Sequence, residues 1–186
     1  MLLHLTNSEL LDYRLQMTGY EPANLDFTIE RTDGINVDAI VANRLRRWYV
    51  EQLHTAPLCY LPVEDVAAET SVMPGKIPNS CIVTLPDGCL RPQSISFEGW
   101  TSEVTVLPEE QYHNIVRAQD NQYLRASADY PVAALCPGRP RSIIAFPTSG
   151  GKLTSLIAVK DPGDNIYILD ETLLNHLPAD DIFNQL

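Results

Sequence analysis

The chain has 186 residues, of which 45% are hydrophobic and 20% charged, and its formal net charge is −11 at pH 7. This is ordinary globular composition, which excludes disorder of the whole chain and allows a core that needs no metal or disulfide support. The excess of acidic residues disfavours binding to duplex nucleic acid. The sequence has no run of about 18 apolar residues, so we expect no membrane-spanning helix.

The N-terminal half predicts three helices, because apolar residues recur at helical spacing and capping residues or prolines mark the ends. The strongest pattern covers residues 38–54 and places Trp48 and Tyr49 on its apolar stripe. Residues 25–29 instead alternate in the manner of a short strand or an extended arm. The other two helices are expected at residues 6–17 and 63–70.

The C-terminal half predicts β-structure, and a proline- and glycine-rich loop at residues 73–79 marks the change. One helix, from Pro108 to about Ala118, interrupts the strands. Tight hairpin turns are expected at residues 147–151 and 161–164. The expected strands are 81–85, 93–97, 101–107, 131–136, 142–146, 153–160 and 165–169.

Together these elements predict an α+β fold in which a helical N-terminal part packs with a mainly antiparallel β C-terminal part. Residues 1–75 form the helical part with its arm, residues 76–170 the β-rich part, and residues 171–186 a short helix with an acidic tail, all within one structural domain. From Asp161 onward there are six carboxylates and no Lys or Arg. Such a run is typical of a solvated acidic face, or of a patch that docks a basic partner or repels DNA.

Gly150, Gly151 and Lys152 suggest a phosphate-binding loop, but their surroundings do not fit one. That loop needs a glycine five residues before the Gly-Lys pair, a hydroxyl residue after the lysine, and a helix that follows. Phe146 and Leu153 occupy the two defining positions, and the next segment is β-patterned. The sequence therefore predicts a turn between strands.

Other candidate sites lack partners. Glu110 and His113 have the spacing of a di-iron ligand pair, which needs a second such pair on a facing helix. Cys89, close to Arg91, is the most suggestive of four thiols, but no histidine can be paired with it and no Cys-x-x-Cys zinc motif occurs. Three aspartates supply too few ligands for an EF-hand, namely Asp161, Asp164 and Asp170. The sequence thus predicts no catalytic residue, no cofactor and no metal, and the absence of a secretion signal predicts reduced thiols in a cytosolic compartment.

A basic cluster adjoins two aromatic residues in the strongest predicted helix. Arg44, Arg46 and Arg47 precede Trp48 and Tyr49. The cluster could contact nucleic acid, form a solvated helix face, or anchor a protein interface. The acidic total favours the second and third interpretations.

Ala42-Asn-Arg-Leu-Arg-Arg-Trp-Tyr49 and Leu85-Pro-Asp-Gly-Cys-Leu-Arg-Pro92, followed by Gly99-Trp100, carry a family resemblance. Across residues 38–107 the chain resembles small virion proteins of tailed bacteriophages, above all of crAss-like phages, that build the head–tail connector. The resemblance implies a non-enzymatic ring homo-oligomer of about a dozen copies that lines the DNA passage. It also implies portal and tail proteins as partners, and a virion location after assembly in the bacterial host cytoplasm. The β-rich half departs from the simpler, mostly helical connectors.

On this interpretation the inter-subunit contacts are expected at Arg46, Arg47, Trp48, Tyr49 and Trp100, with no specific nucleic-acid binding and no membrane contact. Both tryptophans could instead be core residues. The alternative function is a small bacterial ligand-binding or enzyme accessory domain, which would be a monomer or dimer with a concave pocket.

Overall fold

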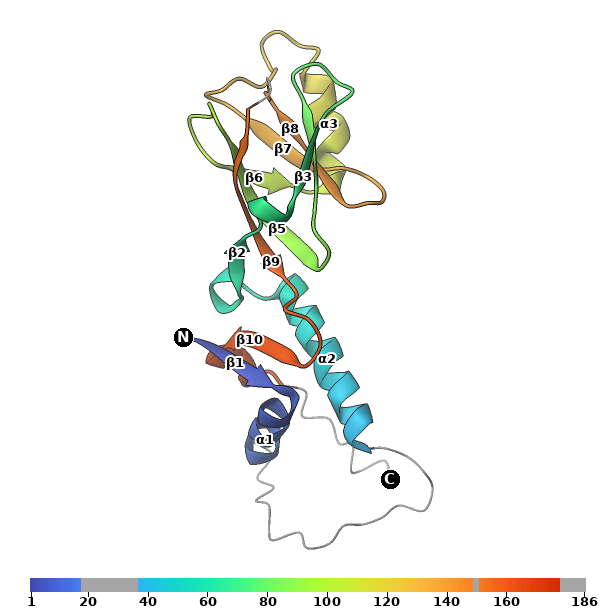
Figure 1. Cartoon of the computed structure of the whole chain (residues 1–186), viewed down its shortest axis with the longest axis vertical. Helices are drawn as coiled ribbons and strands as arrows, with labels where there is room; N and C mark the ends of the chain where they lie inside the picture. Colours follow the sequence, from blue (N-terminus) through green and yellow to red (C-terminus); the bar gives the residue numbers. More distant parts are fainter. Residues whose placement is uncertain (18–36, 149–150, 178–186) are drawn as a thin grey trace, which may run out of the picture. The chain divides into compact units, whose positions relative to one another are not determined.

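The computed structural model describes residues 1–17, 37–148 and 151–177 (Figure 1). The chain divides into two compact units. The first unit is discontinuous and consists of Met1–Pro62 and Asp161–Leu186. The second unit, Val63–Lys160, is inserted between these two segments.

A two-stranded antiparallel sheet joins the two segments of the first unit. Strand β1 (Leu2–Thr6) pairs with β10 (Ile166–Asp170) along its whole length. Tyr167 and Leu169 of β10 are buried while their neighbours are more exposed, which is the period-two alternation of a strand with one covered face.

In the described part of the first unit there are also three helices and a 3₁₀ turn at Leu58–Tyr60. Helix α1 (Asn7–Met17) starts with a capping box, because the Thr6 N–H donates to the Glu9 carboxylate at 2.8 Å and the Glu9 N–H donates to the Thr6 hydroxyl at 3.4 Å. Helix α4 (Glu171–Leu174) is capped by Asp170, whose carboxylate accepts from the Thr172 backbone N–H. The expected helix at residues 6–17 is confirmed in α1.

Helix α2 (Val37–Thr55) is the longest helix and confirms the prediction for residues 38–54. Its last turn closes where the Ala56 N–H donates to the Gln52 carbonyl, and Pro57 follows. The buried side chains of the helix recur three to four residues apart, so they form one stripe. They are Val41, Leu45, Trp48, Tyr49 and Leu53.

The second unit is one eight-stranded sheet curved into a half-barrel, with strand order β2-β9-β5-β6-β7-β8-β4-β3. Neighbouring strands are antiparallel except β6 and β7, which are parallel and are connected through helix α3 (Tyr112–Ala118). Two 3₁₀ turns lie at Ala67–Glu69 and Glu109–Gln111. The strands are β2 Val63–Asp65, β3 Ser71–Pro74, β4 Cys81–Thr84, β5 Cys89–Phe97, β6 Val104–Leu107, β7 Val132–Leu135, β8 Ser142–Phe146 and β9 Leu153–Lys160.

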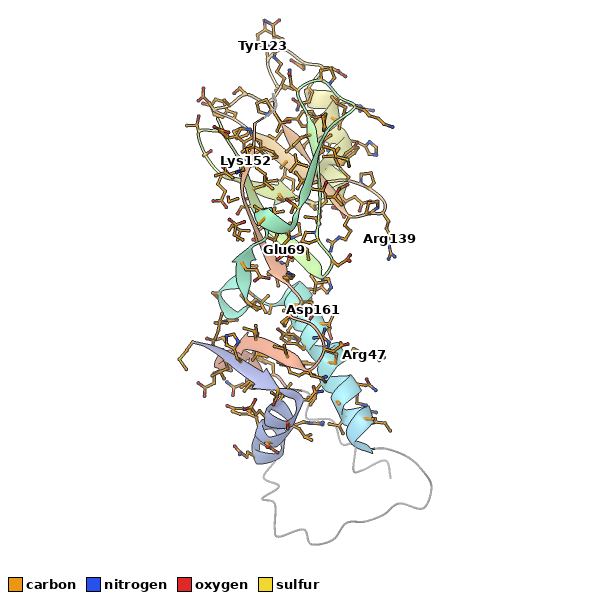
Figure 2. The ribbon with its side chains drawn as sticks, in the orientation of Figure 1. Arg47, Glu69, Tyr123, Arg139, Lys152 and Asp161 are labelled. Carbon is orange, nitrogen blue, oxygen red and sulfur yellow. The ribbon has the colours of Figure 1, made fainter. Side chains whose placement is uncertain are left out.

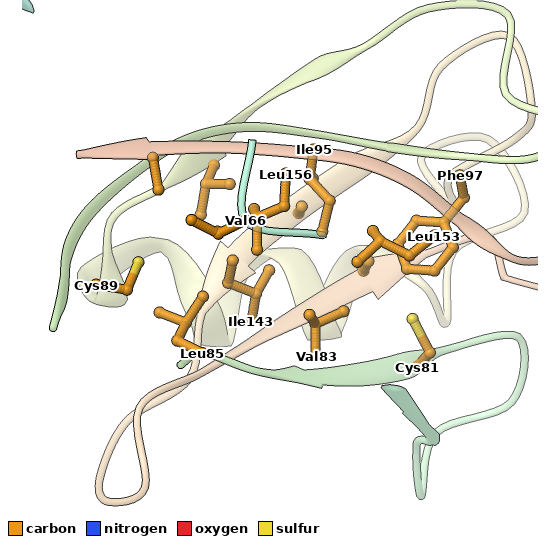
Figure 3. Packing of buried hydrophobic residues seen from close by; sticks show 14 residues of the cluster. Val66, Cys81, Val83, Leu85, Cys89, Ile95, Phe97, Ile143, Leu153 and Leu156 are labelled. Carbon is orange, nitrogen blue, oxygen red and sulfur yellow. The ribbon is translucent and has the colours of Figure 1, made fainter. Parts of the chain in front are cut away.

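The core of the second unit fills the inside of this curved sheet. Figure 3 shows Ile95 and Leu156 from β5 and β9 facing Val83 and Ile143 from β4 and β8. A smaller cluster, which includes Ile144 and Phe146 of β8, packs on the opposite face under α3. Strand β8 is therefore covered on both faces, which explains its uninterrupted apolar sequence.

The expected α+β packing is wrong. The structure is mostly a β-rich half-barrel with a few short helices, 30% helical and 35% strand, and no helical N-terminal part packed on the β part is seen in the described residues. Helices α1 and α2 belong instead to the first unit, with β1 and β10. Helical periodicity identifies an apolar stripe but not the element that covers it. The unit boundaries after Pro62 and Lys160 also differ from the expected parts 1–75, 76–170 and 171–186.

Some of the predicted local elements differ from those in the structure. The helix expected at 63–70 is wrong: β2 and a 3₁₀ turn occupy this segment, held by the Asp65 carboxylate, which accepts from the N–H groups of Ala67 and Leu156. The two hairpin turns are also wrong, because β8 pairs with β4 and β7, β9 with β2 and β5, and β10 with β1. The strand or arm expected at 25–29 lies outside the described residues.

The second unit should fold by itself. Val63 pairs with Val159, so the chain enters and leaves this unit at one place, as expected of an inserted domain. We expect a fragment of residues 63–160 to unfold cooperatively on heating, as followed by circular dichroism. Leu156→Ala should destabilise the fragment by about 2–5 kcal/mol, whereas Val72→Ala, at an exposed position, should change little. A fragment without a cooperative transition would contradict the assignment of an independent core.

Candidate functional site

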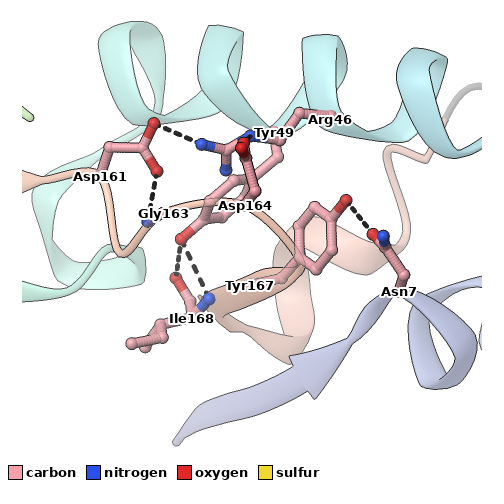
Figure 4. A network of polar contacts seen from close by, with 8 residues as sticks. All are labelled: Asn7, Arg46, Tyr49, Asp161, Gly163, Asp164, Tyr167 and Ile168. Atoms are coloured by element: carbon pink, nitrogen blue, oxygen red, sulfur yellow. Dashed lines mark hydrogen bonds and ion pairs between the residues drawn. The ribbon is translucent and has the colours of Figure 1, made fainter.

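A polar cluster in the first unit connects helix α2 to strand β10 and to the residues that directly precede this strand (Figure 4). We call it the Arg46 cluster, comprising Arg46, Tyr49, Asp161, Asp164 and Tyr167. Arg46 Nη2 lies 2.5 Å from Asp161 Oδ2, and Arg46 Nε lies 3.6 Å from Asp164 Oδ1. The guanidinium is mostly covered, with 21% of the side chain exposed, so the Asp161 pair is better shielded from water than an ordinary surface ion pair.

Tyr49 holds β10 through two hydrogen bonds to one residue. Its hydroxyl donates to the Ile168 carbonyl and accepts from the Ile168 N–H, both at 3.0 Å. The ring meets the edge of Tyr167, with centroids 5.0 Å apart and planes at 71°. Burial raises the pKa of Tyr49 to about 12, so the hydroxyl keeps its proton and remains a donor at neutral pH.

A cavity of about 390 Å³ lies beside this cluster. On its wall the Tyr167 hydroxyl donates to Asn7 Oδ1, and Asn7 Nδ2 donates to Asn165 Oδ1. Arg46 Nη1 is buried and meets no acceptor within the described residues. The lining offers amides, a guanidinium, a carboxylate and a phenol, which suit a small polar molecule. Its residues are Asn7, Ala39, Ala42, Asn43, Arg46, Asp164, Asn165 and Tyr167.

The five expected interface residues fall into different surroundings. Arg46 and Tyr49 serve the Arg46 cluster, and Trp48 is buried on the α2 stripe. Arg47 is exposed. Trp100 belongs to the second unit, where its Nε1 donates to the Pro147 carbonyl at 2.7 Å and its ring packs on Phe97. The structure therefore brings Arg46 and Tyr49 together, and Trp100 has no part in their cluster.

Gly151 and Lys152, the described part of the Gly-Gly-Lys segment, lie beside Glu98 at the start of a strand. Gly150 lies outside the described residues, and Lys152 directly precedes β9, so the described chain continues as a strand. A Cβ on Gly151 would stand 2.8 Å from the Glu98 carbonyl, and the Glu98 N–H donates to the Lys152 carbonyl. Glycine is needed here for close backbone approach.

The remaining candidate groups are separated from one another. Burial raises the pKa of the thiols of Cys81, Cys89 and Cys136, which disfavours the nucleophilic thiolate. Glu110 and His113 are exposed on the surface near α3. Over residues 1–17, 37–148 and 151–177, no group of three or more His, Cys, Asp or Glu side chains could hold a metal ion.

The three aspartates that supply too few ligands for an EF-hand have other partners in the structure. Asp161 and Asp164 contact Arg46, while Asp170 contacts the Met1 amino group and caps α4. Among the helices of the described chain, none is long and apolar enough to cross a membrane.

One loop presents large apolar side chains to solvent. We call residues 119–130 the tyrosine loop; in it Tyr123 is 92%, Leu124 66% and Tyr130 79% exposed. Figure 2 shows Tyr123 at the tip of this loop. Exposed tyrosines and leucines on one segment are characteristic of a contact surface rather than of a folding core.

Hydrogen bonds fix the shape of the tyrosine loop. The Asn121 carbonyl accepts from Leu124 and Arg125, and the Asn121 side chain accepts from the Tyr123 N–H. The Gln119 side chain bridges the Ile115 carbonyl and the Ala126 N–H. A loop held in this way loses little conformational entropy on binding.

Sequence reasoning missed this loop, since residues 120–128 have neither helical nor strand periodicity. One signal was present: three large apolar side chains stand in a polar segment where no periodic face would bury them.

No protein-family model matches the chain, and no curated protein has significant sequence similarity to it.

Removing the Tyr49 hydroxyl should destabilise the first unit. In Tyr49→Phe the Ile168 N–H and carbonyl both lose their partner, so we expect a loss of about 1–3 kcal/mol in the free energy of unfolding, measured by chemical denaturation. Tyr123→Phe, measured at a concentration low enough to keep the chain monomeric, is the matched control, because that side chain is almost fully exposed and its change should have no measurable effect. Equal stability of the two variants would show that Tyr49 does not hold β10.

Proposed function

We propose that this chain is a non-enzymatic structural subunit that assembles with copies of itself, as a subunit of a virion head–tail connector ring between portal and tail proteins. The tyrosine loop is the observation that carries the assembly role. It combines exposed aromatic anchors with a conformation that is already fixed, which are the properties of a surface that binds another protein.

The polar chemistry of the described residues supports a structural role. Arg46 pairs with Asp161, Tyr49 with the β10 backbone, and Asp65 with two backbone N–H groups. Each of these groups stabilises a particular connection in the fold. The connector assignment in particular comes from the sequence resemblance over residues 38–107.

The uneven distribution of charge supports a subunit beside DNA. Of the 24 Asp and Glu residues, 14 lie in the first unit and 10 in the second, while the 13 Lys and Arg residues divide as 5 and 8. The first unit therefore carries −9 and the second −2. A strongly acidic surface that lines a DNA passage repels the phosphates and lets the DNA slide. The nearly neutral second unit can approach another copy without strong repulsion.

The mass of the purified chain in solution tests this function. We expect light scattering coupled to size exclusion to show species well above the 20.8 kDa of one chain, with the proportion increasing with concentration. Electron microscopy of these species should show closed rings, because head-to-tail contacts that close give cyclic symmetry. A chain that stays at 20.8 kDa over the whole concentration range would contradict the proposal.

A ligand-binding domain is the second candidate function, and the cavity beside Arg46 favours it. Its volume of about 390 Å³ falls in the usual range for small-molecule sites, and Arg46 is one of its lining residues. A strictly monomeric chain would favour this candidate over the connector.

A further inference from the structure

We infer that the self-association contact is head-to-tail: Tyr123 and Leu124 of one copy fill a hollow beside strand β3 of the next copy. This inference rests on the proposed function and specifies which surfaces of the second unit make the contact. The protruding part is called the knob, comprising Tyr123 and Leu124, and the receiving part the β3 hollow.

The knob is apolar, exposed and held in place. Tyr123 and Leu124 follow the turn at Asn121, whose side chain and carbonyl accept hydrogen bonds from the backbone N–H groups of both residues. An aromatic ring and a leucine on such a turn can bury a large apolar area without first ordering the loop.

The β3 hollow has an apolar rim and a partly polar floor. Its volume is about 300 Å³. Val72 and Met73 on the rim are 40% and 51% exposed, and methionine adapts its shape readily to an incoming side chain. The lining includes Val72, Met73, Pro74, Ser80, Cys81 and Thr148.

The floor of the hollow is partly polar. The Thr148 hydroxyl is buried next to the Cys81 thiol, to which it offers a hydrogen bond. Ser80 also lies in the lining. The phenol of an inserted Tyr123 can both donate and accept a hydrogen bond, so it suits a hollow of this mixed character.

Side chains, and not strand addition, must make this contact. The Gly75 N–H donates to the Ser80 carbonyl. By the alternation of an antiparallel pair, the backbone N–H and C=O groups of Met73 and Ser71 also point toward β4, whereas the backbone groups of Val72 and Pro74 point away from it. Pro74 has no N–H to donate, which leaves Val72 as the one outward-facing N–H donor of this short strand. The β3 edge is therefore a poor template for another strand, although its side chains remain accessible.

A second copy of this chain is the occupant that fits both surfaces. The knob and the β3 hollow share no residue and both lie in the second unit, whose 10 acidic and 8 basic residues nearly cancel. Two different, complementary patches on one subunit give a head-to-tail contact, and repetition of that contact around an axis gives a ring.

A pairwise mixing experiment tests this contact in the full chain. The knob variant carries Tyr123→Ser and Leu124→Ser, and the hollow variant carries Met73→Asp. All three positions are exposed, so unfolding temperatures should match that of the unchanged chain when both are measured at a concentration low enough to keep the unchanged chain monomeric. Each variant alone should associate at least about tenfold more weakly than the unchanged chain.

An equimolar mixture of the two variants should form a dimer, in which the intact knob of the hollow variant fills the intact hollow of the knob variant. Native mass spectrometry should show this dimer as a two-chain species. Ile40→Ser, an exposed apolar change in the first unit, is the control and should assemble normally.

The outcomes separate this inference from the proposed function. If the unchanged chain assembles and either variant assembles equally well, another surface makes the contact and the inference fails while the proposed function stands. Two non-assembling variants whose mixture stays monomeric would also overturn the head-to-tail pairing. If the unchanged chain itself never assembles, both the inference and the proposed function fail.

Discussion

The first unit depends on the paired hydrogen bonds between the Tyr49 hydroxyl and the backbone of Ile168. β10 is a single strand with one strand partner, β1, and two-stranded sheets have little stability by themselves. The Tyr49 hydroxyl satisfies a backbone donor and a backbone acceptor of β10, and the buried ring packs against Tyr167. Arg46, one turn earlier on α2, fixes Asp161 just before β10. Together these contacts attach the segment that follows the inserted unit to the longest helix.

The two units have different roles in the proposed assembly. The first unit is acidic and is made of segments distant in sequence, held together by the Arg46 cluster and the β1–β10 pair. The second unit has its own core inside the half-barrel and carries the tyrosine loop and the β3 hollow. An insertion whose ends lie side by side allows one unit to be specialised for subunit contacts while the other keeps its own fold. The charge difference between the units agrees with this division.

Local patterns in the sequence predicted α1, α2 and most strands, because capping residues and periodicity act within a few residues. The pairing of strands could not be predicted in this way. β9 and β10 look like neighbours joined by a Pro-Gly turn, yet β10 pairs with β1, whose sequence Leu-Leu-His-Leu-Thr gave no strand prediction. At the candidate sites, the sequence pointed to Arg46, Trp48 and Tyr49 as contact residues between subunits. Their expected role at an interface remains a prediction, whereas the structure shows the intrachain contacts of Arg46 and Tyr49, which depend on residues more than 100 positions away. The tyrosine loop was missed because its exposure depends on tertiary structure.

Hydrogen exchange at the Ile168 amide tests the central role of Tyr49 most directly. We expect this amide to be among the most protected in the first unit and Tyr49→Phe to accelerate its exchange at least about tenfold. The Leu156 amide in the core of the second unit, which donates to Asp65, should be unaffected. Exchange at Ile168 as fast as at an unprotected amide, or unchanged by Tyr49→Phe, would show that the Tyr49 hydroxyl does not hold β10.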